Sequence, residues 1–232
     1  MDYTNAIAAS PNSVRGYVGL AHVFESKGEI NSAIAELQTF LRNFEASGKT
    51  PKDKSVKVPV GELKTYERPG KEPDGSQDVV GRLGTVVIAG NTLEEIEKSK
   101  NAMERSANIR SAYYFLASLF QKIGDLDQAI LSLDKGIALK SDEGQGHGLR
   151  ANARIAKGDL NGAIEDLEAA LKDPMPWQDK NKNRGLLYTL QGRDEDAAKE
   201  FAQFLQRFPK AKDELDKEIA QAHALYTRNA TK

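Results

Sequence analysis

Apolar residues recur every three or four positions through most of the chain, a pattern typical of amphipathic helices. Between residues 111 and 140, one apolar stripe lies before Gly124 and a second lies after it. The first contains Tyr113, Leu116, Ala117 and Phe120, and the second contains Leu126, Ala129, Ile130, Leu133 and Ile137. Glycine readily takes the left-handed conformation that ends a helix. We therefore predict two antiparallel helices joined by a tight turn, which approach closely at the small Ala129.

The turn glycine is part of a repeat. Gly90, Gly124, Gly158 and Gly192 stand 34 residues apart. A related copy at Gly28 lies 96 residues before Gly124, which exceeds two periods by 28 residues and indicates an insertion after the first complete repeat. A fixed period of 34 is typical of stacked helical hairpins.

The same two-stripe pattern fits residues 14–44, 144–172 and 180–208. This alternation of small and large apolar residues resembles the tetratricopeptide repeat (TPR) family. The resemblance implies an all-α fold, a right-handed superhelix of antiparallel helical hairpins (an α-α solenoid) with an irregular insert. The third copy departs from the family pattern, because His147 and Arg154 stand where the family usually has aromatic residues.

The pattern divides the chain into four segments. Residues 1–45 hold the N-terminal hairpin or hairpins, 46–89 form an insert or degenerate repeat, 90–209 hold further repeats, and 210–232 form a C-terminal capping helix and tail. Because the chain starts with a pattern like the second half of a hairpin, we expect it to begin mid-repeat. It is then a piece of a longer repeat protein whose native N-terminus is missing.

The insert differs in composition from the repeats. Half of the eight prolines fall between residues 46 and 89, so we expect a long loop that buries little apolar surface. The valines and glycines of residues 79–88 favour a strand or loop, whereas the intact 34-residue phase favours a distorted helix, which is the interpretation that we adopt. Thr92 and Glu95 form a predicted capping box for a helix that ends near Ser106 and occupies the second-helix position of a repeat.

The C-terminal segment carries one apolar stripe, formed by Leu215, Ile219, Ala222 and Leu225, opposite a charged face. Terminal repeats need a polar outer face, so we interpret this segment as a capping helix. The alternative is the first helix of a further repeat.

The composition of the chain limits the classes of partner and the locations that we expect for this protein. The formal net charge of −1 gives no overall attraction to nucleic acid. No run of 18 apolar residues occurs, so we expect no membrane span. Without cysteine there are no disulfides, but either a cytoplasmic or a periplasmic location is compatible with that absence.

Motifs for catalysis, metals and cofactors are nearly absent. Residues 47–50 (Ser-Gly-Lys-Thr) resemble the end of a phosphate-binding loop but lack its first glycine, and the glycine-rich residues 144–148 are interpreted as a hairpin junction. His22, His147 and His223 lie in different repeats without metal-binding spacing. We therefore predict a protein that is not an enzyme and binds no cofactor or metal.

The family resemblance implies a concave groove lined by the first helix of each hairpin. The groove positions are Arg15, Val18, His22, Ser26, Ser111, Tyr114, Ser118, Lys122, Gln145, Gly148, Asn152, Ala156, Asp179, Lys182, Leu186 and Leu190. The candidate partner-binding residues among them are His22, Tyr114, Ser118, Lys122, Asn152 and Lys182. Lysine can meet a carboxylate, asparagine can bond a peptide backbone, and tyrosine can supply apolar area.

Chaperone-binding members of the family carry a clamp of lysine, asparagine and arginine. Here the corresponding positions hold Val18, His22, Phe115, Gln145 and Leu149, so binding to a chaperone tail is disfavoured. We predict a scaffold that binds a segment of a partner protein or peptide in the groove. The alternative is a structural module that self-assembles into a homo-oligomer, with the insert covering the groove or mediating the contacts between copies.

Overall fold

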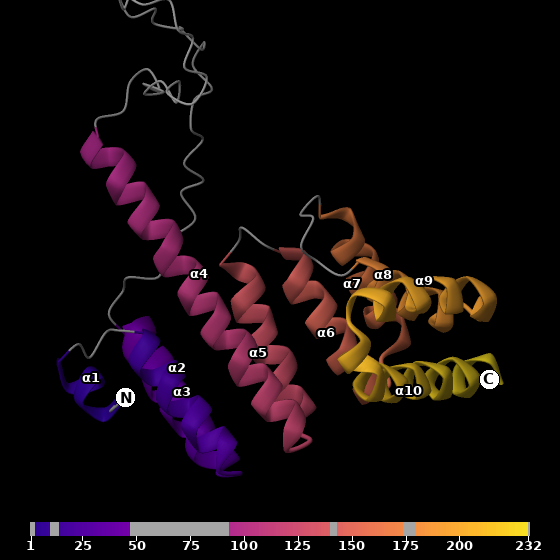
Figure 1. Cartoon of the computed structure of the whole chain (residues 1–232), viewed down its shortest axis with the longest axis horizontal. Coiled ribbons are helices and arrows are strands. Elements are labelled where there is room, and N and C mark those ends of the chain that lie inside the picture. The colour runs from indigo at the N-terminus through magenta and orange to yellow at the C-terminus, as the bar shows by residue number, and fades with distance from the viewer. Residues whose placement is uncertain (1–2, 10–13, 47–92, 140–142, 174–179, 232) are drawn as a thin grey trace, which may run out of the picture. The chain divides into compact units, whose positions relative to one another are not determined.

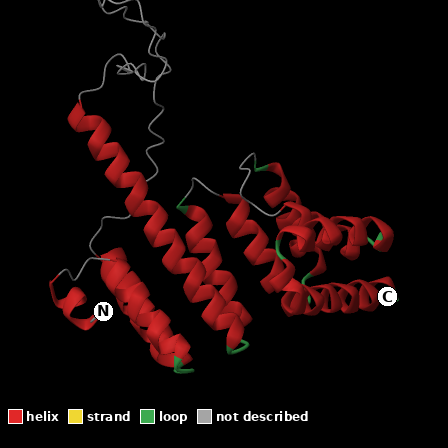
Figure 2. Cartoon of the chain, viewed as in Figure 1, coloured by secondary structure: helices red, strands yellow, loops and turns green. Residues whose placement is uncertain are grey.

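The computed structural model describes residues 3–9, 14–46, 93–139, 143–173 and 180–231. The α-helices are α1 (Tyr3–Ala9), α2 (Val14–Ser26), α3 (Ile30–Ala46), α4 (Leu93–Lys122), α5 (Leu126–Ala138), α6 (Glu143–Lys157), α7 (Leu160–Lys172), α8 (Lys180–Leu190), α9 (Asp194–Arg207) and α10 (Lys212–Ala230), with a short 3-10 helix η1 (Pro209–Ala211) (Figure 1). These ranges contain helices and their connections and no strand (Figure 2). The expected all-α class is confirmed.

The turn glycines behave as predicted. Gly28, Gly124, Gly158 and Gly192 have φ angles of 78°, 81°, 89° and 72°, the left-handed region that glycine enters without a steric penalty. Each glycine joins the two helices of one hairpin: α2 to α3, α4 to α5, α6 to α7 and α8 to α9. Gly90, the remaining member of the 34-residue series, lies outside the described residues.

An aspartate after two of these glycines starts the next helix. Asp125 accepts a hydrogen bond from the backbone N–H of Gln128 at 3.1 Å, and Asp159 accepts one from Gly162 at 3.0 Å. Such N-caps satisfy a backbone donor that the helix leaves free. The Gly-Asp pair therefore ends one helix and begins its partner.

Two buried clusters hold the hairpins together. One joins apolar residues of α2, α3, α4 and α5 with Ala153 of α6, and the other joins residues of α6 to α10. Equivalent alanines of the four second helices, Ala33, Ala129, Ala163 and Ala197, are 0–3% exposed. This confirms the expectation that each pair of helices approaches closely at a small residue.

The helix after Gly90 differs from the prediction. It does not end near Ser106, because α4 continues without interruption from Leu93 to Lys122. Its sequence contains no glycine or proline, the residues that most readily end a helix. Residues 93–106 are therefore part of a first helix and do not form the second helix of a separate repeat.

The capping residue Thr92 and the predicted insert, residues 46–89, fall almost wholly outside the described residues. Ala46 alone is described, as the last residue of α3.

The third hairpin replaces the expected aromatic packing with a charged network. Asp166 of α7 is 2% exposed and accepts hydrogen bonds from Arg150 Nε and Nη2 at 2.9 and 2.6 Å. Arg154 Nη1 and His147 Nδ1 lie 2.9 and 2.8 Å from its two carboxylate oxygens. The hydrogen bonds that Arg150 donates to Asp166, and one that it donates to Asp134, raise the pKa of Arg150. One buried carboxylate thus joins three side chains of α6 to α7.

The glycine-rich residues 144–148 are not a hairpin junction, contrary to the prediction, because they lie inside α6. A Cβ atom at Gly146 would overlap the Tyr114 hydroxyl of α4, and one at Gly148 would lie 3.0 Å from Asn183 of α8. Glycine at position 146 leaves room for the side chains of Tyr114 and Ile137, which pack against its backbone.

Replacing Gly124 should test the turn without a packing effect, because a Cβ atom there would meet nothing within 4 Å. We expect Gly124→Ala to lower the free energy of unfolding by roughly 1–2 kcal/mol, the strain of a left-handed alanine. Gly124→Asn should lower it less, since asparagine tolerates this conformation. Urea denaturation followed by circular dichroism measures both; equal stability of the wild type and the alanine variant would contradict the prediction.

Replacing Asp166 should test the charged network. Asp166→Asn removes the buried negative charge that faces Arg150 and Arg154, so we expect a loss of about 3–5 kcal/mol of unfolding free energy. Asp134 also bonds Arg150 but its side chain is 47% exposed, and Asp134→Asn should change stability by less than about 1 kcal/mol. Equal losses in the two variants, measured by urea denaturation, would show that burial of Asp166 is not decisive.

Candidate functional site

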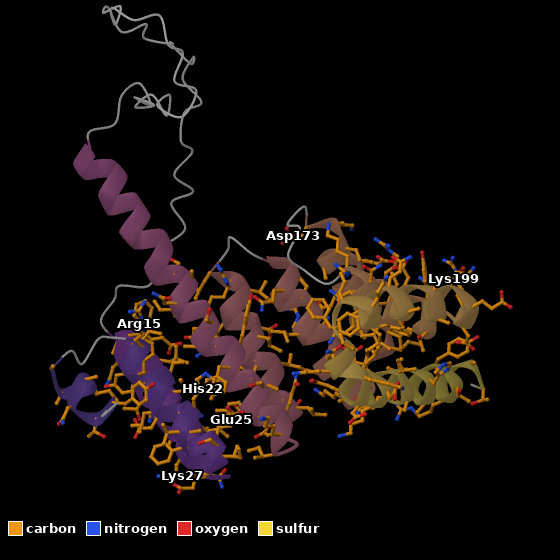
Figure 3. The ribbon with its side chains drawn as sticks, in the orientation of Figure 1. Arg15, His22, Glu25, Lys27, Asp173 and Lys199 are labelled. Carbon is orange, nitrogen blue, oxygen red and sulfur yellow. The ribbon has the colours of Figure 1, made fainter. Side chains whose placement is uncertain are left out.

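The predicted groove residues on α2 and α4 form an exposed patch. The His22 ring stacks on Phe115 with 4.1 Å between ring centroids, and its Nδ1 lies 3.2 Å from Glu25. Lys122 donates a hydrogen bond to the same Glu25 carboxylate. The side chains of His22 and Lys122 are 59% and 53% exposed. We call His22, Glu25, Phe115 and Lys122 the α2–α4 patch (Figure 3 labels His22 and Glu25).

Electrostatics keep this patch charged at neutral pH. The hydrogen bond from Lys122 lowers the pKa of Glu25, so its carboxylate stays ionised. The patch combines a cation, an anion and two stacked rings on adjacent helices. Ser118 is half-buried one turn before Lys122, where its hydroxyl donates to the Phe115 carbonyl at 2.8 Å. A partner would therefore meet a mixed polar and aromatic surface.

Tyr114 is placed differently from the prediction. It is only 7% exposed, and its ring lies where Cβ atoms at Gly136 of α5 and Gly146 of α6 would overlap it. The ring fills the space between successive hairpins. Its apolar area is used in the stack and is not presented to a partner in this structure.

Asn152 and Lys182 are brought together by a third residue, Glu218 of α10. Lys182 Nζ donates to Glu218 Oε1 at 2.9 Å, and Asn152 Nδ2 donates to the same oxygen at 2.7 Å. The amide oxygen of Asn152, Oδ1, and the second carboxylate oxygen of Glu218, Oε2, are buried without a hydrogen-bond partner. The prediction of Asn152 and Lys182 did not include Glu218. The sequence feature that could have identified Glu218 is its position three residues after Leu215, on the apolar face of the helix.

The environment of Glu218 disfavours its charged form. Its side chain is 15% exposed, and burial raises its pKa above the ordinary 4.5, with the repulsion of Glu214 adding to the rise. The charge and hydrogen bond of Lys182 and the hydrogen bond of Asn152 act in the opposite direction but do not cancel it. An ionised Glu218 is thus held in a site that only partly compensates its lost hydration.

The packing of α10 explains why these residues meet. The earlier first helices α6 and α8 each pack on the second helix that precedes them, but α10 contacts α6, α7 and α8 and makes few contacts with α9 (Figure 1). Its predicted stripe is confirmed, since Leu215, Ala222 and Leu225 are buried. They share a cluster with groove positions that the sequence assigned to a partner, Leu186 and Leu190.

This packing does not fit the alternative in which α10 is the first helix of a further repeat. The helix instead covers part of the first-helix face of the third and fourth hairpins. Its C-terminal end contacts both of their turns: Arg228 donates to the Gly158 carbonyl at 3.2 Å, and the Tyr226 ring lies where a Cβ atom at Gly192 would overlap it.

A pocket of about 230 Å³ lies between α3, α4 and α5 and was not foreseen from the sequence. Its lining includes Leu41, Leu116 and Ser132. Glu45 joins the helices by accepting hydrogen bonds from Tyr113 at 2.6 Å and Lys135 at 2.8 Å. These bonds lower the pKa of Glu45, while burial and Glu45 raise that of Tyr113. Three of the side chains around this pocket, those of Glu45, Tyr113 and Lys135, are therefore engaged with one another.

Two negative findings apply to the described part of the chain. It contains no group of three or more histidine, cysteine, aspartate or glutamate residues placed to hold a metal ion. None of its helices is both long enough and apolar enough to cross a membrane.

The raised pKa of Glu218 predicts a pH effect. The folded chain binds its proton at a higher pH than the unfolded chain, so the associated stability is complete below pH 4.5 and is lost as pH rises through the folded pKa. Glu218→Gln cannot ionise. We therefore expect its stability relative to wild type to increase from pH 4.5 towards neutrality, as measured by urea denaturation. The matched control is Glu168→Gln, which replaces an exposed glutamate of α7; a parallel pH dependence in both variants would contradict the assignment.

Sequence comparison finds TPR proteins. Profiles of the tetratricopeptide repeat match residues 111–143 and 183–211, which span parts of the second and fourth hairpins. Tetratricopeptide repeat protein 36 of Homo sapiens is 38% identical over 130 residues, covering 53% of this chain and 66% of that protein. The Bos taurus protein of the same name is 36% identical over 89 residues, covering 37% and 47%. The chain thus spans less than two thirds of the length of these relatives.

A solved structure of MamA aligns over 91% of this chain and 87% of its own, with 18% identity and a TM-score of 0.49. This similarity is too low to carry an argument. The repeat matches fall on hairpins whose turns and buried alanines follow the 34-residue period. The chain is a member of the tetratricopeptide repeat family.

Proposed function

We propose that this protein is a non-catalytic scaffold that binds a segment of a partner protein on its first helices, with the α2–α4 patch as the contact region. Membership of the TPR family supports an interaction scaffold in general. The observation that supports this particular surface is the exposed stack of His22 on Phe115 beside the Lys122–Glu25 pair.

The two halves of the predicted groove differ in availability. On α6 and α8, Asn152 and Lys182 are engaged with Glu218 of the chain's own α10. On α2 and α4, His22 and Lys122 keep more than half of their side-chain surface exposed. A partner can therefore reach the α2–α4 patch without moving any described helix.

The chemistry of the patch favours a peptide segment over a small molecule. The stacked rings offer apolar area, and Lys122 and Glu25 offer a donor and an acceptor at the edge of it. Protein interfaces are built in this way, with aromatic anchors surrounded by polar groups. A partner segment with one apolar side chain flanked by polar groups matches this arrangement.

Substitutions in the patch test the proposal. Peptides selected from a random phage-displayed library on the wild-type chain should bind His22→Ala and Lys122→Glu at least tenfold more weakly, because each change removes a contact in the patch. Fluorescence anisotropy with synthetic copies of the selected peptides measures the affinities.

Lys199→Glu is the matched control, since Lys199 is an exposed lysine of α9 with a 72% exposed side chain (Figure 3). Its affinity should equal that of wild type. Selected peptides that bind all four chains equally would place the binding surface elsewhere. Circular dichroism of each variant confirms that helicity is retained.

A further inference from the structure

We infer that the surface under α10 is itself a binding site for amphipathic helices, and that α10 is an occupant that a partner helix of the same pattern displaces. The inference rests on the proposed function in treating the chain as an interaction scaffold. It assigns a second surface, on α6 and α8, and a partner class defined by the helix that occupies it in the structure.

The occupant defines the recognition pattern. Leu215, Glu218, Ala222 and Leu225 stand at offsets of three, seven and ten residues, which place them on one face of a helix. All four side chains are buried or mostly buried, whereas most of the remaining helix is exposed. A groove recognises an amphipathic helix by the pattern on its buried face, which here is an apolar stripe interrupted by one carboxylate.

The surface below is complementary to that pattern. Leu186 and Leu190 of α8 lie in the same buried cluster as the leucines of α10. Beside them, Lys182 and Asn152 both donate to the Glu218 carboxylate. The site therefore selects a helix with two leucine-sized anchors, a small residue between them, and a carboxylate three residues after the first anchor.

The attachment of α10 is compatible with its release. The helix makes few contacts with α9 and follows it through the short η1, whose Pro209 and Lys210 are exposed. Its polar contacts are incomplete, because Glu218 Oε2 and Asn152 Oδ1 are buried without partners. Buried acceptors without partners weaken an interface. Because α10 is covalently linked to the rest of the chain, its effective concentration at this surface is high, and this link contributes much of what keeps α10 bound.

A synthetic peptide of residues 212–230, labelled with a fluorophore, serves as the probe. In the wild-type chain the peptide competes with the attached α10, so we expect weak binding. In the full chain with Leu215→Glu and Leu225→Glu, the attached helix loses both anchors and the site is free. We expect at least tenfold tighter binding of the peptide to this variant, measured by fluorescence anisotropy.

A charge exchange tests the polar contact. Adding Lys182→Glu to the double variant should abolish the gain, and a peptide carrying Glu218→Lys should restore it. Adding Lys199→Glu, an exposed lysine of α9, should leave the gain unchanged. A folded double variant that binds the peptide no more tightly than wild type, or a Lys182→Glu chain that retains the gain, would overturn the inference.

If circular dichroism shows that the double variant is unfolded, a second measurement tests whether the peptide displaces α10. The chain has no cysteine, so Glu195→Cys and Ala224→Cys introduce two labelling sites at exposed positions of α9 and α10. Pulsed electron resonance between two spin labels reports their distance. Excess peptide should add a population with a changed distance, and an unchanged distribution at saturating peptide would refute displacement.

Failure of the α10 site can be distinguished from failure of the proposed function. Peptides selected on the α2–α4 patch depend on His22 and Lys122 and are not affected by Lys182→Glu. If the α10 peptide fails to bind while those peptides still do, the second site is wrong and the scaffold proposal stands.

Discussion

The close approach of two helices at a small residue is the contact on which the rest of this structure depends. Ala33, Ala129, Ala163 and Ala197 are almost wholly buried at equivalent places, and a left-handed glycine turns the chain five residues earlier in each case. A larger side chain there would separate the helices of the hairpin. Because α6 packs on α5 and α8 packs on α7, the hairpins stack on one another, and residues far apart in the sequence share one surface.

That shared surface is divided by the chain's own last helix. On α2 and α4, charged and aromatic side chains remain exposed, with Glu25 linking His22 and Lys122. On α6 and α8, the equivalent positions are covered by α10 and paired with Glu218. A repeated fold thus has two chemically different surfaces, one open and one filled by an internal helix.

Deviations from the family pattern have physical explanations in the helices that pack against them. His147 and Arg154 replace aromatic residues because Asp166 of the partner helix supplies a buried carboxylate that binds both. Gly146 is small because Tyr114 of the preceding hairpin occupies the space above it. Asp166 lies 19 residues after His147 on the second helix of the same hairpin, and Tyr114 lies 32 residues before Gly146 in the preceding hairpin, so neither partner belongs to the local helix pattern.

The sequence alone determined the hairpins of this protein, because helix periodicity, turn glycines and N-capping aspartates act within a few residues of each other. It also predicted the apolar stripe of α10 and the groove positions His22 and Lys122, which remain exposed. Only the tertiary structure decided that Tyr114 is buried and that α10 folds back onto α6 and α8. Both outcomes depend on contacts between separate hairpins, and the local pattern of a helix does not specify which neighbouring surface will bury its apolar face.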